Sequence, residues 1–282
     1  KIMNTGKPIV GEIQREMWPH RDDTFVQVVK QPWYDSSGQL SGTFGVSTDV
    51  TGIVGSQERL EEIALDLQAK NRSYKEELGL AREVQQALLP THDGHWDERT
   101  AVVAGLAKIE NKYIPATELA GDYFDVIPLG QGKVGLFICD VMGHGVRSAL
   151  VVAMIKGLME KASHHAERPA NFLSKMNRGL CRILGTADMD MFATACYIVA
   201  DFNENALRVA SAGHDLPLLV EKGSRVLMDC DIPKGPALGF FEDAVFESRT
   251  YELNTIAEAL LYTTGIYKSV NKRGEEWGKQ HF

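Results

Sequence analysis

The feature that most constrains the fold is a column of apolar residues spaced seven apart in the first third of the chain. A repeat of seven keeps one stripe of a helix facing a partner helix, which is the pattern of a two-stranded coiled coil. Pro90 ends this helix, because proline cannot continue one. We therefore predict a helix over residues 53–90 and a homodimer formed through it; the alternative is a single helix lying on a domain. The column consists of Ile53, Leu60, Leu67, Tyr74, Ala81 and Leu88, with Ile63, Leu78 and Val84 at a second position on the same side.

Composition narrows the class of protein. The net charge of −8 argues against a nucleic-acid partner, which would need a basic face. The longest apolar run, "SALVVAMIKGLM", is broken by Lys156 and is too short to span a bilayer, so we expect no membrane segment in this chain. The four cysteines show no CxxC spacing, which indicates free thiols and a cytoplasmic location rather than a zinc site. Because the chain does not begin with Met, we expect a piece of a longer protein.

Residues 1–52 have the pattern of a small antiparallel sheet. Three strand-like runs, "GEIQREMWP", "TFVQVVKQPWYD" and "LSGTFGVSTDVT", are present, with "DSSGQ" as a turn between the last two. The ending, with Pro32, Asp35, Gly38 and "TDVT" at 48–51, resembles the C-terminal half of a PAS sensor domain. We expect a partial PAS-like sheet over residues 1–52, which buries little apolar surface by itself.

Residues 91–282 carry strands on both sides of two helices. The helix-like runs are residues 146–163 and 169–184. This order predicts a layered α+β fold. The strand-like runs are "TAVVAGLAKI", "YFDVIPLG", "KVGLFICD", "FATACYIVAD", "ALRVASAG", "PLLVEKG" and "ALLYTTGI".

Two of these runs place carboxylates at strand ends. A hairpin joining "YFDVIPLG" to "KVGLFICD" through "GQG" brings Asp122 close to Asp140. Two neighbouring carboxylates repel each other and are costly to bury unless a positive charge lies between them. Mg²⁺ and Mn²⁺ prefer such oxygen ligands. Gly143 and Gly145 allow a tight turn that leaves the carbonyl of Val141 free to bind.

The residues alone leave a structural alternative open. Asp122 and Asp125 are also suited to turns or caps, and Asp140 can cap the helix that follows. His144 in the glycine turn is expected to orient that turn rather than to act as a general acid. His214 is expected to hydrogen-bond backbone near the site, and a purely structural role is equally compatible with the pattern.

A series of motifs runs in order through residues 81–282. These segments are "AREVQQALLP", "ELAGDYFDVIPL", "VGLFICDVMGHGVRSALVVAM", "KMNRGL", "MFATACYIVAD", "ASAGHDLPLLV", "GPALGF" and "LLYTTGIYKSVNKRGEEWG". Over nearly all of residues 81–282 their order resembles the RsbU and stage II sporulation protein E branch of the metal-dependent serine/threonine protein phosphatases, the protein phosphatase 2C superfamily.

The resemblance implies a specific fold and chemistry. It implies a four-layer α-β-β-α phosphatase sandwich over residues 91–282, and two Mn²⁺ or Mg²⁺ ions held by Asp122, Asp140 and the Val141 carbonyl. Asp122 and Asp140 are then the catalytic residues as well, because a water activated by both ions attacks phosphorus. The implied substrate is a phosphorylated small regulatory protein of the anti-sigma-factor antagonist type.

The chain departs from the family pattern at three places. Ala120 replaces the first glycine of "GGD", and Thr264 stands where the "TDG" motif has a metal-binding aspartate. The chain also ends at Phe282, before the usual "DD.T" segment, so we expect the phosphatase domain to be C-terminally incomplete. A hydroxyl is a poor replacement for a carboxylate on Mn²⁺ or Mg²⁺. The rival hypothesis is therefore a pseudophosphatase that binds a regulatory partner without turnover; a nucleotide cyclase is disfavoured, because no phosphate-cradling glycine loop is present.

Overall fold

The computed structural model describes residues 2–92, 95–96, 107–130, 132–187, 189–224, 226–271 and 273–278. The chain forms two compact units, Lys1–Glu76 and Glu77–Phe282, and each is described by itself. None of the helices in these ranges is both long and apolar enough to cross a membrane. The predicted strand "TAVVAGLAKI" lies mostly outside the described residues.

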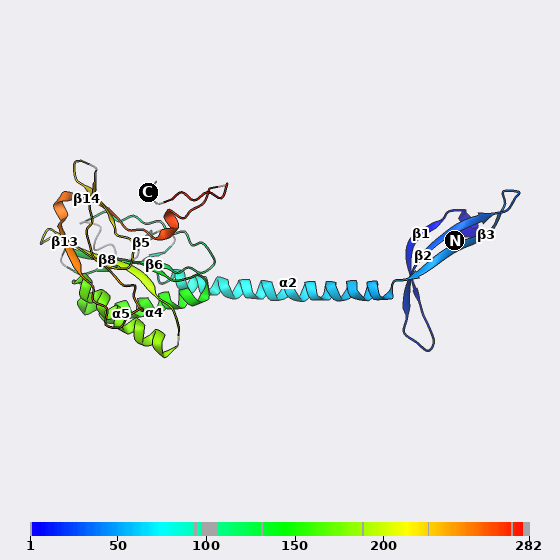
Figure 1. Cartoon of the computed structure of the whole chain (residues 1–282), viewed down its shortest axis with the longest axis horizontal. Helices are drawn as coiled ribbons and strands as arrows, with labels where there is room; N and C mark the ends of the chain where they lie inside the picture. The colour runs from blue at the N-terminus through cyan, green and yellow to red at the C-terminus, as the bar shows by residue number, and fades with distance from the viewer. Residues whose placement is uncertain are drawn as a thin grey trace. The chain divides into compact units, whose positions relative to one another are not determined.

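The first unit is an antiparallel sheet with a short helix before it. Helix α1 is Ile2–Thr5, and the strands β1 (Ile9–Glu16), β2 (Thr24–Tyr34) and β3 (Leu40–Asp49) pair in the order β1-β2-β3 (Figure 1). The three predicted strands are therefore confirmed. Val28 is buried, whereas Phe44 and Val46 on β3 are exposed, so the sheet buries little apolar surface. Its assignment to a PAS domain stays a prediction.

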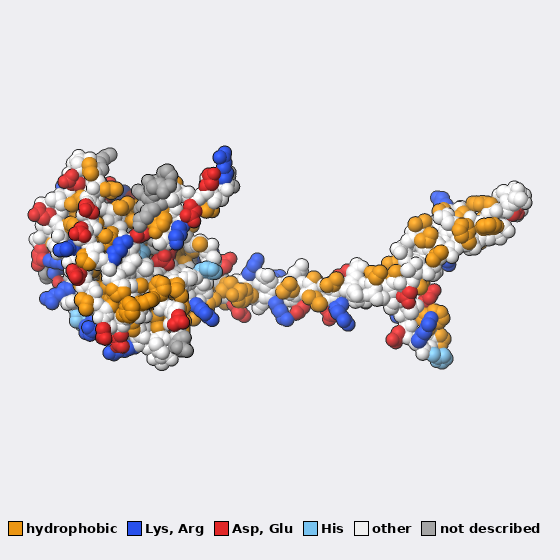
Figure 2. Space-filling model, in the orientation of Figure 1, with side chains coloured by type: hydrophobic (Ala, Val, Ile, Leu, Met, Phe, Trp, Pro, Cys, Tyr) orange, Lys and Arg blue, Asp and Glu red, His pale blue; other side chains and the backbone are white. Residues whose placement is uncertain are grey.

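Helix α2, Thr51–Gln86, follows directly and covers most of the range predicted as a helix. It ends earlier than predicted, because the chain tightens into i→i+3 hydrogen bonds before Pro90, including Leu88 N–H to the Gln85 carbonyl at 3.1 Å. A residue before proline avoids the helical conformation, which explains the early end. The heptad residues Ile53, Leu60 and Leu67 are exposed, and hydrophobic side chains recur between charged ones along the helix (Figure 2).

The second unit is built on a six-stranded sheet. Its strands run in the order β12-β9-β8-β7-β6, with β13 added to β9, and every pair except β12–β9 is antiparallel. A second sheet has the order β11-β10-β14. A short hairpin, β4 with β5, precedes both sheets. The strands are β4 (Thr91–His92), β5 (His95–Trp96), β6 (Asp122–Pro128), β7 (Lys133–Val141), β8 (Ala193–Asp201), β9 (Ala206–Ala212), β10 (Leu218–Glu221), β11 (Leu227–Met228), β12 (Lys234–Gly235), β13 (Ser248–Glu252) and β14 (Ile256–Leu260).

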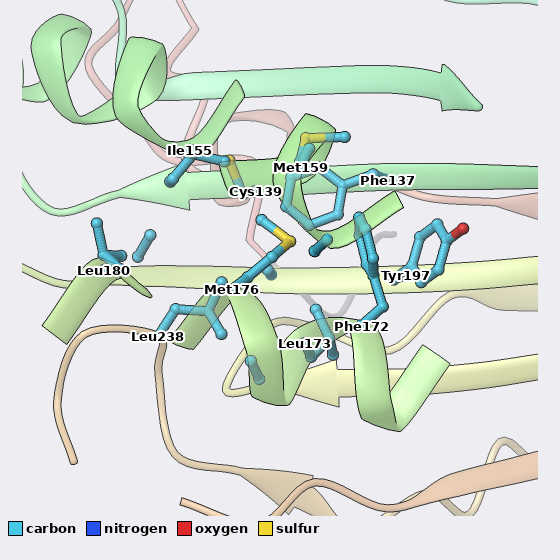
Figure 3. Close-up of a cluster of buried hydrophobic side chains, with 14 of the residues drawn as sticks. Phe137, Cys139, Ile155, Met159, Phe172, Leu173, Met176, Leu180, Tyr197 and Leu238 are labelled. Atoms are coloured by element: carbon cyan, nitrogen blue, oxygen red, sulfur yellow. The ribbon is translucent and has the colours of Figure 1, made fainter. Parts of the chain in front are cut away.

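Two helices, α4 (Val146–Ala162) and α5 (Pro169–Thr186), cover one face of the large sheet (Figure 1). They match the predicted helices within a few residues, and the short helix η1 (Ser163–His165) joins them. Pro169 starts α5, since its fixed φ suits the first helical turn. Phe172 of α5 packs on Tyr197 of β8 with ring centroids 4.5 Å apart, and Phe137 completes this aromatic core (Figure 3).

The opposite face of the large sheet has its own apolar core. Val126, Ile198 and Val209 of the large sheet lie in one buried cluster with Leu219 of β10. The helices, the large sheet and the small sheet thus supply three of the four predicted layers within the described residues. The predicted α+β class is confirmed. Strands β6 and β7 belong to the large sheet, which lies between these two cores.

Candidate active site

Asp122 and Asp140 lie directly opposite each other on β6 and β7. Opposed residues of an antiparallel pair point to the same face, with Cβ atoms about 4.5–5.5 Å apart. The hairpin turn between the strands contains Gly130 and Gly132, both with positive φ, at 74° each. The sequence-based hairpin argument therefore places these two carboxylates correctly, on the face of the sheet turned away from α4 and α5.

The two carboxylates are electrostatically strained as a pair. Burial, and next the negative charge of Asp140, raise the pKa of Asp122 to about 6. Burial also raises the pKa of Asp140, although the neighbouring Lys268 and His214 side chains oppose the rise. Such a pair is stabilised by a cation placed between its oxygens.

The lack of a side chain at Gly121, next to Asp122, leaves room for an ion beside the backbone. A Cβ atom on Gly121 would lie only 2.6 Å from the Val141 carbonyl oxygen and 3.2 Å from that of Gly143. Glycine at 121 therefore keeps the space beside the Val141 oxygen open. Gly143 and Gly145 have φ of 84° and 86°, a region that favours glycine, so the tight turn after β7 also depends on them.

Two adjacent threonines reach the carboxylates from the loop after β14. The Thr263 hydroxyl donates to Asp122 Oδ2 at 2.9 Å. The side chain of Thr264, at the start of the short helix η3 (Thr264–Ile266), lies beside Asp140 and lowers the pKa of that carboxyl. These donors partly satisfy the carboxylates without a metal. Across the described residues, no group of three or more His, Cys, Asp or Glu side chains is placed to hold a metal ion.

The donor set therefore fits one hard divalent cation and not two. Two carboxylates and one backbone carbonyl are oxygen ligands of the kind that Mg²⁺ and Mn²⁺ take, with water completing the shell. A second ion would add two positive charges, and the further carboxylate beside Asp140, that of Asp215, is already paired with Lys234.

His214 is buried beside the site and holds the threonine loop. Its Nε2 lies 2.9 Å from the Tyr262 carbonyl, which only accepts, so Nε2 carries the proton. Its Nδ1 then accepts from the Thr194 hydroxyl at 2.8 Å. Burial lowers the pKa of His214, which favours this neutral form. The expectation of a backbone hydrogen bond is confirmed, and it fixes the segment just before Thr263.

A cavity of about 230 Å³ opens next to Asp140. It joins the end of β7 to the loops that carry His214 and Thr264. Its lining residues are Asp140, Met142, Phe192, Thr194, Gly213, His214, Asp215, Thr264 and Tyr267. His144 is exposed in the turn and does not line this cavity.

Asp125 belongs to the other face of the sheet. It is 3% exposed and forms an ion pair with Lys156 of α4, with Nζ and Oδ2 2.6 Å apart. The Tyr123 hydroxyl donates to the same oxygen at 2.9 Å. Asp125 therefore links the sheet to α4 and is neither a turn residue nor close to the carboxylate pair. The odd spacing from Asp122 already implies this, because alternate residues of a strand face opposite sides.

Gln85, at the end of α2, is a site residue that the sequence reasoning missed. Its side-chain amide donates to the Ala120 carbonyl at 2.8 Å and accepts from the Ala120 N–H at 3.1 Å. Nearby, Arg82 pairs with Glu118. Ala120 lies two residues before Asp122, so the helix end directly positions the segment that carries this carboxylate. The only signal in the sequence was the glutamine within "AREVQQALLP".

Comparisons with known proteins identify the family of this chain. Residues 130–282, more than half of the chain, match the family described as Stage II sporulation protein E (SpoIIE). The chain belongs to the SpoIIE family. Its fold is similar to that of the SiaA-PP2C domain of Pseudomonas aeruginosa, with a TM-score of 0.61 and 19% identity, covering 76% of this chain and 81% of that one. At this identity the likeness shows the fold alone.

Two curated relatives carry the name phosphoserine phosphatase, both from Bacillus subtilis (strain 168). RsbP is 27% identical over 194 residues, which cover 68% of this chain and 45% of RsbP. RsbU is 25% identical over 208 residues, which cover 74% of this chain and 58% of RsbU. The chain thus spans about half the length of the curated relatives it matches.

Proposed function

We propose that this chain is a metal-dependent phosphatase that removes phosphate from a serine or threonine of a regulatory protein. The observation that carries the proposal is the register of β6 and β7, which opposes Asp122 and Asp140 beside the open Val141 carbonyl. The names of the SpoIIE-family relatives support the same reaction class.

Each residue of the candidate site has its own role in the proposed reaction. Asp122, Asp140 and the Val141 carbonyl would hold Mn²⁺ or Mg²⁺. Bound metal supplies a Lewis acid that lowers the pKa of water and polarises a phosphoryl oxygen. Asp140 points into the cavity where the phosphoryl group binds. His214 holds the Tyr262 carbonyl and thereby keeps the loop with Thr264 against that cavity.

The proposed substrate is a phosphorylated small protein of the anti-sigma-factor antagonist type. Its support is the similarity to RsbP and RsbU. We further propose three functional segments: a partial PAS sensor at 1–52, a dimeric coiled coil at 53–90 and the phosphatase domain at 91–282. The Gln85 contact to Ala120 is the route by which the helix would influence the carboxylate pair.

The test is hydrolysis of a phosphoserine peptide across a Mn²⁺ titration. The unchanged chain should show Mn²⁺-dependent turnover, and Asp140→Asn should lose at least about a factor of ten, equivalent to ~1.4 kcal/mol in the barrier. Asp243→Asn, at an exposed position outside the site, is the matched control and should keep the activity. Turnover that Asp140→Asn leaves unchanged would contradict the proposal.

One observation favours a second candidate, a pseudophosphatase. Thr264 stands beside Asp140 where the family pattern has a carboxylate, and the described residues contain no group of three or more His, Cys, Asp or Glu side chains placed to hold a metal ion. Thr264→Asp should then raise both Mn²⁺ affinity and turnover. If neither the unchanged chain nor Thr264→Asp hydrolyses the peptide at saturating Mn²⁺, while the chain still binds a phosphorylated partner, the pseudophosphatase is the better description.

A further inference from the structure

The charge around the cavity is poorly matched to a phosphorylated ligand. Asp140 and Asp215 line the cavity, and Asp122 lies opposite Asp140. A phosphoserine adds a further charge of about −1.5 to −2 at neutral pH. One divalent ion offsets the Asp122–Asp140 pair and leaves little positive charge for the phosphate. Phosphate binding at this cavity therefore needs an additional cation.

Two lysines lie close to the cavity, and they differ in their partners. Lys234 is paired with Asp215, with Nζ and Oδ1 3.4 Å apart. The backbone N–H of Lys268 donates to the Thr264 carbonyl at 3.1 Å, which places Lys268 one turn beyond Thr264 and next to Tyr267. Thr264 and Tyr267 both line the cavity.

The side chain of Lys268 is exposed and available. In the part of the chain that the structure describes, it forms no ion pair with a carboxylate. It directly follows Tyr267, which lines the cavity together with Asp140. Lys268 thus lies next in the chain to a residue that lines the cavity, and its ammonium group is not held in an ion pair among the described residues.

We propose that Lys268 binds the phosphoryl oxygens of the substrate at the rim of this cavity, so that the site works with one divalent ion and one ammonium group. This inference rests on the proposed function. A lysine ammonium offers three donors on a flexible stem, and its hydrogen bonds to phosphate are charge-assisted. The short helix η3 begins at Thr264, which lines the cavity with Asp140, and the lysine follows Thr264 by one turn.

The test measures binding rather than turnover. Inorganic phosphate is titrated calorimetrically into the full chain at a fixed Mn²⁺ concentration, for the unchanged protein, Lys268→Gln and Lys268→Arg. Lys175→Gln, at an exposed position on α5, is the matched control for loss of one positive charge. We expect Lys268→Gln to weaken phosphate binding about tenfold or more, and Lys268→Arg and Lys175→Gln to stay close to the unchanged chain.

A Mn²⁺ titration of the same variants shows whether Lys268 acts on phosphate directly or through the binding of the metal ion. Mn²⁺ affinity should be equal or tighter in Lys268→Gln, because a positive charge near Asp140 is removed. The inference is overturned if Lys268→Gln binds phosphate as tightly as the unchanged chain, if Lys175→Gln weakens binding equally, or if the unchanged chain binds no phosphate.

Failure of this inference is distinguishable from failure of the proposed function. Phosphate binding that depends on Lys268 in a chain without hydrolysis supports the inference and contradicts the phosphatase. Hydrolysis whose KM for the phosphoserine peptide is the same in Lys268→Gln supports the phosphatase and overturns the inference.

Discussion

At the scale of single residues, the site is a pair of carboxylates held together by backbone register. Asp122 and Asp140 are forced to share one face by the β6–β7 hairpin, and burial makes their ionised forms costly. The pair titrates as a unit, because each charge affects the other. Its protonation therefore contributes to the stability of the folded chain.

The metal-free protein should lose stability as the pH rises from about 4 to about 6. The pKa of Asp122 in the folded state is raised from 3.8 to about 6, so in this range the folded state binds more protons than the unfolded state. This contribution is fully present below the unfolded pKa and is lost as the pH rises through the folded pKa. Thermal unfolding in a chelator should show the fall, and Asp122→Asn should flatten it. An equal slope in the variant would assign the effect to other groups.

Removing the ion-pair partner of a buried carboxylate should strongly lower the free energy of unfolding. Lys156→Met leaves Asp125 buried without its ion pair, and such a loss costs about 3–5 kcal/mol. Urea unfolding monitored by circular dichroism measures the change. The double variant Asp125→Asn/Lys156→Met should recover much of the stability, and Lys161→Met, exposed on the same helix, should have little effect. A Lys156→Met variant as stable as the parent would show that Asp125 needs no partner.

At the scale of elements, the end of α2 is part of the second compact unit, which carries the candidate site. Gln85 is 8% exposed and satisfies both backbone groups of Ala120. Gln85→Ala leaves a buried N–H and a buried carbonyl without partners and should destabilise the unit by about 1–3 kcal/mol. Gln86→Ala, at the exposed neighbouring position, is the control. Chemical denaturation measures the free energy of unfolding of both variants. Equal stabilities would mean that water replaces the Gln85 contacts.

Local elements were predictable because their causes are local. The hairpin, α4 and α5 follow from strand and helix periodicity, from the glycines of the turns and from Pro169. The opposition of Asp122 and Asp140 follows in turn from the hairpin. These features depend on residues close together in the sequence, so one sequence is enough to place them.

Contacts between distant segments were not predictable in the same way. Gln85 meets Ala120 across 35 residues, and Thr263 meets Asp122 across 141 residues. Neither polar side chain differs in the sequence from one that faces solvent. The side of the sheet on which Asp125 lies could have been deduced from its spacing, but its partner Lys156 depends on how α4 packs.

At the scale of the whole molecule, the exposed heptad stripe of α2 predicts a dimer. Light scattering at tens of micromolar should give twice the chain mass, and Leu60→Asp/Leu67→Asp should give the monomer, because two charges enter the apolar seam. Gln68→Asp/Ala69→Asp adds the same charge outside the seam and should stay dimeric. Monomers throughout would favour the alternative of a helix that lies on a domain.

The two-point contact between Gln85 and Ala120 also has a mechanical consequence. Both hydrogen bonds come from one side-chain amide and end on one residue, so they bear torque as well as tension. Rotation of the C-terminal end of α2 about the helix axis would strain both hydrogen bonds at once. If one bond breaks, the amide is no longer aligned for the other. We therefore expect the two hydrogen bonds to form and break together rather than one at a time.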